Sequence, residues 1–239
     1  MQQIKKLVIL GTGGNSIDIL DTVNDLNSCS SKNLFECVGF LDDNESVWGS
    51  TLHGVKVLGP LCCAKKLTNC VFVNGIGSPS NFYKKHSIIR STGIPEGRFE
   101  TIVHPTATIS GIAKLGMGTV IFQNVTITSN VRIGNHVIVL PNSVISHDDV
   151  IGDYTCVASG VCISGGVEVG RACYLGSNSS IIGNVRIGEC SLIGMGSVVL
   201  ENVPPNSVFA GNPARFLRSS IKESHDADIA ARSAVITRN

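Results

Sequence analysis

Residues 121–156 read IFQNVT-ITSNVR-IGNHVI-VLPNSV-ISHDDV-IGDYTC, six hexapeptides that each begin with Ile or Val. The same phase runs from Val103 to Val199, and all seventeen positions reached in steps of six carry Val, Ile or Leu. The residue four positions after each of these is small or β-branched in sixteen of seventeen cases, and Asp149 is the exception. A helix needs apolar residues at intervals of three and four, and a half-buried strand needs them at every second residue. The period of six therefore predicts very short strands joined by tight corners and coiled into a prism.

Three hexapeptides make a coil of eighteen residues, so the repeat region predicts between five and six coils. The large aliphatic residues stack along the axis, and the small inward residues leave room where the chain turns. We expect an all-β solenoid over residues 101–218, followed by a polar tail over residues 219–239 without an assigned role. A purely structural solenoid, such as an adhesin or an ice-binding protein, is the alternative that the period alone leaves open.

The first hundred residues have a different pattern, which predicts a small Rossmann-like α/β domain over residues 1–100. Residues 5–10 indicate a buried strand, and a glycine turn and a helical pattern over residues 17–26 follow at once. Further strands are expected over residues 37–41, 55–58 and 71–73, and a second helix over residues 81–91. Alternation of strands and helices is typical of a parallel sheet.

The glycine turn is a plausible phosphate cradle, because backbone amides at the start of a helix favour an anion. It reads G-x-G-x-x-S, with Ser16 in place of the third glycine of a dinucleotide fingerprint. Asp42 lies about thirty residues after Gly13, further than the usual spacing of about twenty for a ribose-binding acid. A tight turn without a ligand stays an alternative, and a full NAD-binding domain does not fit so short a segment.

Composition excludes several classes of protein. The 239 residues carry 19 basic and 18 acidic side chains, so the formal charge of +1 gives no footprint for nucleic acid or an anionic membrane. Nine cysteines occur without a C-x-x-C pair, which argues against a zinc ribbon or a thioredoxin-like site. The apolar run Leu7–Leu10 is too short for a signal peptide or a membrane span. We expect a reduced, cytoplasmic protein with no membrane span and no metal site.

The hexapeptide register ends in Val208-Phe209-Ala210-Gly211-Asn212-Pro213-Ala214-Arg215, and with this ending the chain resembles the hexapeptide-repeat acyltransferases. The resemblance implies a left-handed parallel β-helix, an exception to the usual right-handed crossover. It also implies a homotrimer with acetyl-coenzyme A (acetyl-CoA) bound between neighbouring coils. The two halves together are similar to the branch that N- or O-acetylates sugars for surface glycans, including sialic acid O-acetyltransferases and the bacillosamine-pathway N-acetyltransferases of UDP-4-amino sugars.

This resemblance implies roles for specific residues. Positions expected near the acetyl-CoA are Cys156, Gly165, Gly176, Ser177, Met195, Gly211, Asn212, Pro213 and Arg215. Positions expected near the nucleotide-linked sugar are Gly13, Gly14, Asn15, Asp42, Asp43, Gly77 and Ser78. Two departures from the family stand out: relatives often carry histidine where this chain has Asn15, and some carry a second histidine where it has Cys156.

His147 is the candidate general base. It is the third residue of the hexapeptide opened by Ile145, which places it at a corner and directs it outward. Imidazole can accept a proton near pH 7, although a solvated surface histidine also fits this position. The segment Ser143–Asp148 matches the family motif Ser-Val-Ile-x-His-[Glu or Asp], which favours the catalytic interpretation. By the same resemblance Asp148 orients the imidazole and the Gly165 N–H donates to the oxyanion. Asp149 competes with Asp148 for the supporting role.

The function predicted from these residues is transfer of acetyl from acetyl-CoA to the amino group of a nucleotide-linked amino sugar, by direct attack with His147 as the base. A sialic acid O-acetyltransferase and a non-catalytic nucleotide-sugar-binding scaffold are the alternatives. A zinc hydratase on this solenoid needs a histidine pair five residues apart plus a third histidine, and His136 and His147 are eleven apart. A nucleotidyltransferase needs a longer N-terminal domain and a basic G-x-G-T-[RK] loop, and neither is present.

Overall fold

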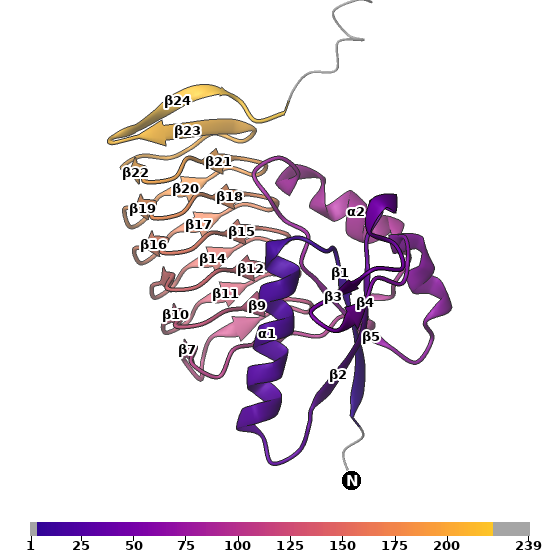
Figure 1. Cartoon of the computed structure of the whole chain (residues 1–239). Coiled ribbons are helices and arrows are strands. Elements are labelled where there is room, and N and C mark those ends of the chain that lie inside the picture. The colour runs from indigo at the N-terminus through magenta and orange to yellow at the C-terminus, as the bar shows by residue number, and fades with distance from the viewer. Residues whose placement is uncertain (1–3, 222–239) are drawn as a thin grey trace, which may run out of the picture.

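The computed structural model describes residues 4–221, and most of the predicted polar tail lies outside them. A β-solenoid stands beside a smaller N-terminal layer of helices and strands, and the layer covers one face of the solenoid (Figure 1). The solenoid is a left-handed β-helix of parallel strands, as the hexapeptide register predicts. No helix among residues 4–221 is long and apolar enough to cross a membrane.

The solenoid has three faces, each built from strands of two residues that pair in parallel with the coils below and above. Face 1 begins with β6 (Ile102–Val103), β9 (Val120–Ile121), β12 (Ile138–Val139), β15 (Cys156–Val157), β18 (Tyr174–Leu175) and β21 (Leu192–Ile193). Face 2 contains β7 (Thr108–Ile109), β10 (Thr126–Ile127), β13 (Val144–Ile145), β16 (Cys162–Ile163), β19 (Ser180–Ile181) and β22 (Val198–Val199). Face 3 contains β8 (Lys114–Leu115), β11 (Arg132–Ile133), β14 (Val150–Ile151), β17 (Glu168–Val169) and β20 (Arg186–Ile187).

The top coil is closed by an antiparallel hairpin of β23 (Ser207–Gly211) and β24 (Ala214–Ser219), which continues face 1. Its tip projects to the side of the solenoid opposite the N-terminal layer (Figure 1). The predicted cofactor loop Gly211–Arg215 is this tip.

Backbone hydrogen bonds explain why the register does not slip. A strand N–H donates to the carbonyl seventeen residues further on, as in Val144 N to Val161 O at 2.8 Å. The aliphatic residues of the six-residue period fill the interior, and most of them are fully buried. Many corners turn through a residue with positive φ, most often Asn or Gly, the types that tolerate this conformation best.

The N-terminal layer contains a three-stranded parallel sheet in the order β2-β1-β5, made of β1 (Lys5–Leu10), β2 (Phe35–Leu41) and β5 (Val71–Asn74). Helix α1 (Gly14–Cys29) follows β1, and helix α2 (Lys85–Ser91) covers the second half of the segment expected to be helical. The 3₁₀ helices of this layer are η1 (Glu45–Val47), η2 (Leu61–Lys66), η3 (Phe82–Lys84) and η4 (Glu96–Arg98).

The strand predicted over residues 55–58 does not join this sheet as a full strand. Only β4 (Val55–Lys56) forms, and it pairs antiparallel with β3 (Thr51–Leu52) in a hairpin. Val57 makes a single parallel bridge to Phe40. A four-residue apolar run fits a hairpin arm and a sheet strand equally well, so the pattern alone does not distinguish them.

The two layers share one apolar core. Helix α1 contributes Ile19, Leu20 and Val23 to a cluster that also contains Phe122 and Ile138 of the solenoid. Val23 lies one turn after Ile19 and Leu20, so the three residues form one apolar face, and this face packs against face 1.

Lys85 is the unusual member of this interface. Its side chain is fully buried, and its Nζ lies 3.6 Å from the Cys156 Sγ, the one hydrogen-bond partner it has among residues 4–221. Burial lowers the pKa of Lys85, because an ammonium without solvent or a carboxylate partner is costly.

We therefore expect Lys85→Met to stabilise the protein at neutral pH, by about 1–4 kcal/mol, since methionine fills a similar volume without a charge. Thermal unfolding of the two proteins at pH 7 measures the difference. Lys84→Met, at the preceding residue, is the control and should change the melting temperature little. A lower melting temperature for Lys85→Met would contradict this account of the ammonium as an unfavourable buried group.

Candidate active site

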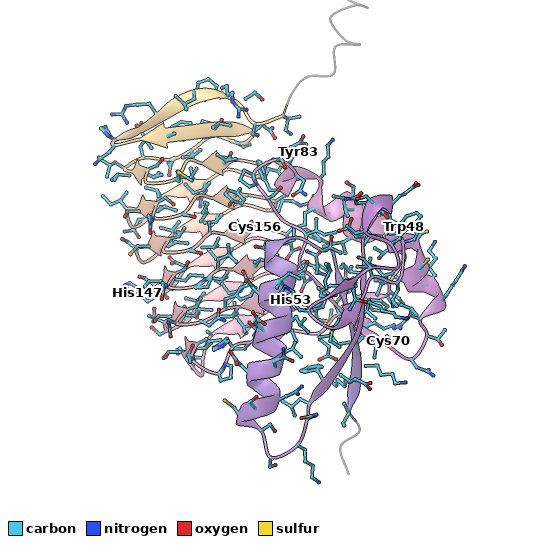
Figure 2. The ribbon with its side chains drawn as sticks, in the orientation of Figure 1. Trp48, His53, Cys70, Tyr83, His147 and Cys156 are labelled. Carbon is cyan, nitrogen blue, oxygen red and sulfur yellow. The ribbon has the colours of Figure 1, made fainter. Side chains whose placement is uncertain are left out.

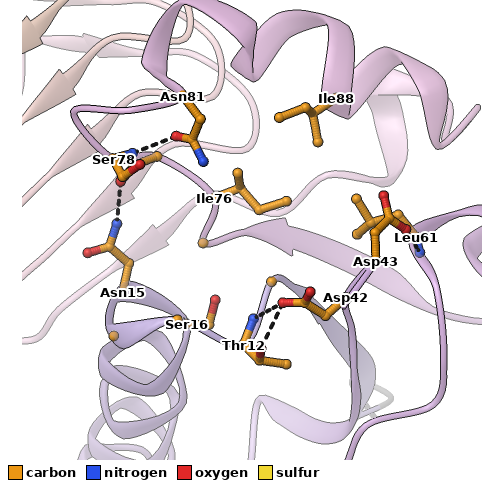
Figure 3. Close-up of a pocket in the computed structure, with 15 residues that line it drawn as sticks. Thr12, Asn15, Ser16, Asp42, Asp43, Leu61, Ile76, Ser78, Asn81 and Ile88 are labelled. Atoms are coloured by element: carbon orange, nitrogen blue, oxygen red, sulfur yellow. Dashed lines mark hydrogen bonds between the residues drawn. The ribbon is translucent and has the colours of Figure 1, made fainter. Parts of the chain in front are cut away.

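A cavity of about 450 Å³ opens at the carboxyl ends of β1, β2 and β5. Its walls are the turn after β1, the acidic turn after β2 and the loop after β5 (Figure 3). All seven residues predicted to bind the nucleotide-linked sugar line it: Gly13, Gly14, Asn15, Asp42, Asp43, Gly77 and Ser78. Ligands in parallel α/β sheets bind at this edge, where the carboxyl ends of strands meet.

The start of α1 forms one wall of the cavity. No side chain caps this helix, and its first turn contains no acidic residue, so the positive end of the helix dipole faces the cavity. A Cβ added at Gly13 or Gly14 would meet no atom within 4 Å. Packing of the protein itself does not demand glycine at either position, and the space they leave can admit an anion close to the backbone.

Ser16 stands where a dinucleotide fingerprint carries its third glycine, and the structure shows how it fits. Ser16 is completely buried, and a Cβ at Gly75 would lie 3.0 Å from the Ser16 Cα. Gly75 therefore supplies the close approach between helix and strand that the third glycine would otherwise give.

The polar side chains of the cavity are largely held by the protein. Asp42 Oδ2 accepts hydrogen bonds from the backbone N–H of Thr12 at 2.8 Å and from its hydroxyl at 2.7 Å. Asp43 Oδ1 accepts from the Leu61 N–H at 2.8 Å. Asn15 Nδ2 donates to the Gly77 carbonyl at 3.0 Å, which ties α1 to the loop after β5. The rigid carboxylates and amide thus shape the cavity before any ligand binds.

Several other residues of this cavity are not predicted by the sequence pattern, among them Thr12, Asn81 and Ile88. Asn81 was assigned only as the start of a helix; its Oδ1 accepts from the Ser78 N–H at 2.8 Å and fastens the loop (Figure 3). This hydrogen bond runs back to the preceding loop and does not cap the 3₁₀ helix η3, so a helix-start pattern does not predict it.

His147 lies at the corner between β13 and β14, which we call corner 2–3 because it joins faces 2 and 3. Its ring is 65% exposed, and its Nδ1 lies 2.8 Å from Asp148 Oδ2. A hydrogen bond from Nδ1–H to the carboxylate leaves Nε2 as the proton acceptor of the neutral ring.

Asp148 is positioned by the corner itself. Its φ of 65° is the left-handed conformation, shared by Asn130 eighteen residues earlier. Asn130 Nδ2 donates to Asp148 Oδ1 at 2.7 Å. This hydrogen bond, followed by that from His147, lowers the pKa of Asp148, so the carboxylate is charged and can orient an imidazolium.

Gly165 lies one coil above His147 at the same corner. A Cβ at this position would overlap the imidazole, 2.6 Å from its Nε2, so the ring rests against the bare Cα. No group among residues 4–221 accepts a hydrogen bond from the Gly165 N–H, which leaves this donor available beside the base. The structure thus brings together the three residues predicted to be catalytic.

Asp149 faces the interior of the solenoid rather than His147, and it is completely buried. Its Oδ1 accepts from the Val167 N–H at 2.8 Å, while its Oδ2 has no partner in the described structure. Burial raises the pKa of Asp149 to about 7, although the backbone N–H groups of Val167 and Ser146 oppose the shift. In this structure the carboxylate bonded to His147 is that of Asp148.

The residues predicted to contact acetyl-CoA divide among three places. Gly165 is at corner 2–3, and Arg215 reaches the same side of the solenoid through an ion pair with Glu201 at 3.1 Å. Gly176, Ser177 and Met195 follow β18 and β21, at the corner between faces 1 and 2. Cys156 lies beneath the N-terminal layer, against Lys85 and Gly77.

His147 and the cavity occupy different sides of one chain. Figure 2 shows His147 at the edge of the solenoid that faces away from the N-terminal layer. A single chain therefore does not bring the candidate base to the candidate sugar pocket. Among residues 4–221, no group of three or more His, Cys, Asp or Glu side chains is arranged to hold a metal ion.

Fold and site together define a left-handed β-helix protein with an α/β layer that carries a ligand cavity. Solved structures share this architecture: the acetyltransferase domain of PglB from Neisseria gonorrhoeae in complex with acetyl coenzyme A has a TM-score of 0.79 at 22% identity, over 90% of this chain and 100% of the other. PerB from Caulobacter crescentus in complex with CoA and GDP-perosamine has a TM-score of 0.75 at 24% identity, over 90% of this chain and 99% of the other. WeeI from Acinetobacter baumannii has a TM-score of 0.75 at 26% identity, over 89% of this chain and 100% of the other.

The sequence itself matches no protein-family model and no curated protein. The structural likeness confirms, at the level of the fold, the resemblance to hexapeptide-repeat sugar acetyltransferases that the register predicted.

Gly165→Ala should displace the His147 ring and lower kcat by about 100-fold, the usual cost of misplacing a catalytic group by about an ångström. The melting temperature should change little, because the corner is exposed at the surface. Gly111→Ala is the matched control: this glycine has the same position in the coil three turns below Gly165, and a Cβ there meets nothing within 4 Å. Equal kcat for both variants would show that the ring position at Gly165 does not matter.

Proposed function

We propose that this protein is an acetyl-CoA-dependent N-acetyltransferase whose acceptor is the amino group of a nucleotide-linked sugar. The observation that carries the proposal is the contact of His147 with both Asp148 and Gly165. It places a proton acceptor, an orienting carboxylate and an available N–H donor at one corner. Structures of similar fold contain acetyl coenzyme A, or CoA together with GDP-perosamine, which supports the same pair of substrates here.

The reaction needs only these groups. The amine nitrogen attacks the thioester carbonyl carbon, and His147 Nε2 accepts a proton from that nitrogen. The carbonyl oxygen becomes negative and takes a hydrogen bond from the Gly165 N–H, a contribution of about 3 kcal/mol for a well-placed donor. Collapse of the intermediate breaks the carbon–sulfur bond, and the proton held by His147 leaves with the coenzyme A thiol. The products are the amide and coenzyme A.

The cavity of the N-terminal layer suits a nucleotide diphosphate. The uncapped start of α1, with Gly13 and Gly14, offers backbone N–H groups to the phosphates. Asp43 keeps Oδ2 free to accept hydrogen bonds from a base or ribose, since only its Oδ1 is bonded. In this proposal the layer serves as the Rossmann-like sugar-nucleotide domain that the sequence predicts over residues 1–100.

A homotrimer would complete the site. The cavity and His147 lie on different sides of a chain, so the sugar held by one copy reaches the base of a neighbour only if copies are arranged head to tail around an axis. Exposed apolar side chains on the side of corner 2–3 and the hairpin support such contact: Ile182, Leu200, Phe216 and Leu217. Gly176, Ser177 and Met195, at the adjacent corner, would then line acetyl-CoA from the neighbouring copy.

Release of coenzyme A, followed with a thiol reagent, tests the reaction. Acetyl-CoA with one of a panel of UDP-, dTDP- and GDP-linked amino sugars should give turnover, and His147→Ala should lower kcat by 10²–10⁴-fold, the usual contribution of a general base. Release with free sialic acid but with no amino sugar would assign O-acetylation instead. Binding of a nucleotide sugar without release from any acceptor would assign a binding scaffold.

Subunit complementation tests the trimer. Gly14→Glu adds a carboxylate to the wall of the cavity at a position where a Cβ meets no atom within 4 Å, and it should abolish sugar binding in a folded protein. Co-expressed with His147→Ala, it should recover about a quarter of wild-type activity, because random mixing of copies rebuilds that fraction of sites. Co-expression of His147→Ala with Gly165→Ala is the control: both changes affect the same corner, so no recovery is expected. No recovery in either mixture would place each site within one chain.

A further inference from the structure

Polar residues of the inward column, four positions after each aliphatic residue, follow one rule in the lower coils. In five of them the side chain donates to the carbonyl fifteen residues further on: Thr101, Thr119, Ser143, Thr155 and Cys173. Ser179, Ser191 and Ser197, in the upper coils, do not make this hydrogen bond. Thr119 and Thr155 also accept a hydrogen bond from the N–H eighteen residues further on. The side chains of Thr119 and Thr155 are thus each tied to two backbone groups of the coil above.

An ionised Asp149 can make only one of the two hydrogen bonds that Thr119 and Thr155 make. Its Oδ1 accepts from Val167, eighteen residues further on, as the threonines do. The carbonyl fifteen residues further on belongs to Ser164, and no donor to that carbonyl is present among residues 4–221. The buried Oδ2 of Asp149 also lacks a partner there. By analogy with Thr119 and Thr155, the Ser164 carbonyl is the group that Asp149 Oδ2 would meet. An ionised carboxylate cannot donate to it, so both oxygens stay unsatisfied.

We propose that Asp149 is a neutral carboxylic acid whose Oδ2–H donates to the Ser164 carbonyl, and that it thereby positions the Gly165 N–H beside His147. Protonation turns Asp149 into the counterpart of Thr119 and Thr155, with one donor and one acceptor. The pKa of this carboxyl, raised to about 7 by burial, is consistent with a proton held at neutral pH.

The link to the active site is covalent. The Ser164 carbonyl and the Gly165 N–H are the two ends of one peptide group, which is planar. A hydrogen bond that holds the oxygen toward the interior fixes the direction of the N–H. It also polarises the peptide group, which strengthens the N–H as a donor. Asp149 is therefore a positioning residue, and its effect on catalysis rests on the proposed function.

Few other charges influence Asp149. The titratable groups that face it are His147 and Asp148 on its own coil. The same column presents Val131 in the coil below and Val167 in the coil above. The protonation state of Asp149 is thus set chiefly by burial and by its backbone partners.

Substitutions separate these roles. Asp149→Val removes both side-chain hydrogen bonds while keeping a residue type that the column already accepts, and we expect kcat to fall about tenfold with little change in KM. Asp149→Thr restores the donor and acceptor of the threonine rule, and should recover most of this loss. Thr155→Val is the matched control, because it removes the same pair of hydrogen bonds at a corner away from His147, and should leave kcat unchanged.

The pH profile distinguishes positioning from packing. Asp149→Asn carries an N–H donor at every pH, whereas the wild-type acid loses its donor above about pH 7. The ratio of kcat for Asp149→Asn to kcat for wild type should therefore rise about tenfold between pH 6.5 and 8.5. A ratio independent of pH, or wild-type kcat for Asp149→Val, would overturn the proposal. If Asp149→Val does not fold, the pH dependence of the ratio of kcat for Asp149→Asn to kcat for wild type still tests the proposal.

Infrared spectroscopy tests the proton without any substrate. Wild type at pH 6 should show the carbonyl stretch of a protonated carboxyl that Asp149→Asn lacks, and this band should disappear as the pH rises. Absence of the band would overturn the proposal even if acetyl transfer is observed. If the band is present but none of the acceptors gives release of coenzyme A, the neutral acid is upheld and only the proposed function is contradicted.

Discussion

The backbone hydrogen bonds between residues seventeen to nineteen apart are the constraint on which the solenoid depends. Because they repeat without slip, side chains eighteen residues apart lie one above the other. This register places Gly165 against the His147 ring and the Val167 N–H above Asp149. The interior of the coils is closed to water, so an inward polar group is stabilised only when it finds a partner in the protein, as Thr119 and Thr155 do in the coil above. The arrangement of His147 and Gly165 at corner 2–3 thus follows from the pairing of the coils.

The same register explains what the sequence predicts well. Residues at the same place in successive coils follow from counting, so the stacking of His147 and Gly165 needs no knowledge of side-chain packing. The cavity is predictable for a comparable reason: the segments around Gly13, Asp42 and Gly77 each follow a strand of one parallel sheet, and the ends of such strands meet at one edge. Local pattern and topology suffice where contacts are dictated by a repeat or by a sheet.

Features that depend on backbone angles or on packing between layers could not be predicted in this way. Asp148 and Asp149 are equally close to His147 in sequence, and only the left-handed φ of Asp148 turns its carboxylate toward the ring. The family resemblance implies a cofactor contact at Cys156, yet in the structure the N-terminal layer covers this residue and places Lys85 against it. That contact joins residues 71 positions apart and has no signature in spacing.

The two halves of the protein tolerate change differently, which bears on how acceptor specificity can vary. The cavity is built from loops after three strands, and a substitution at Gly13 or Gly14 meets open space. One residue inserted between His147 and Gly165 would instead break the eighteen-residue register and turn inward side chains outward, as a slip does in any strand. Under the proposed function, the acceptor can therefore change through the loops alone, whereas the corner that carries His147 is fixed by the same hydrogen bonds that hold the solenoid together.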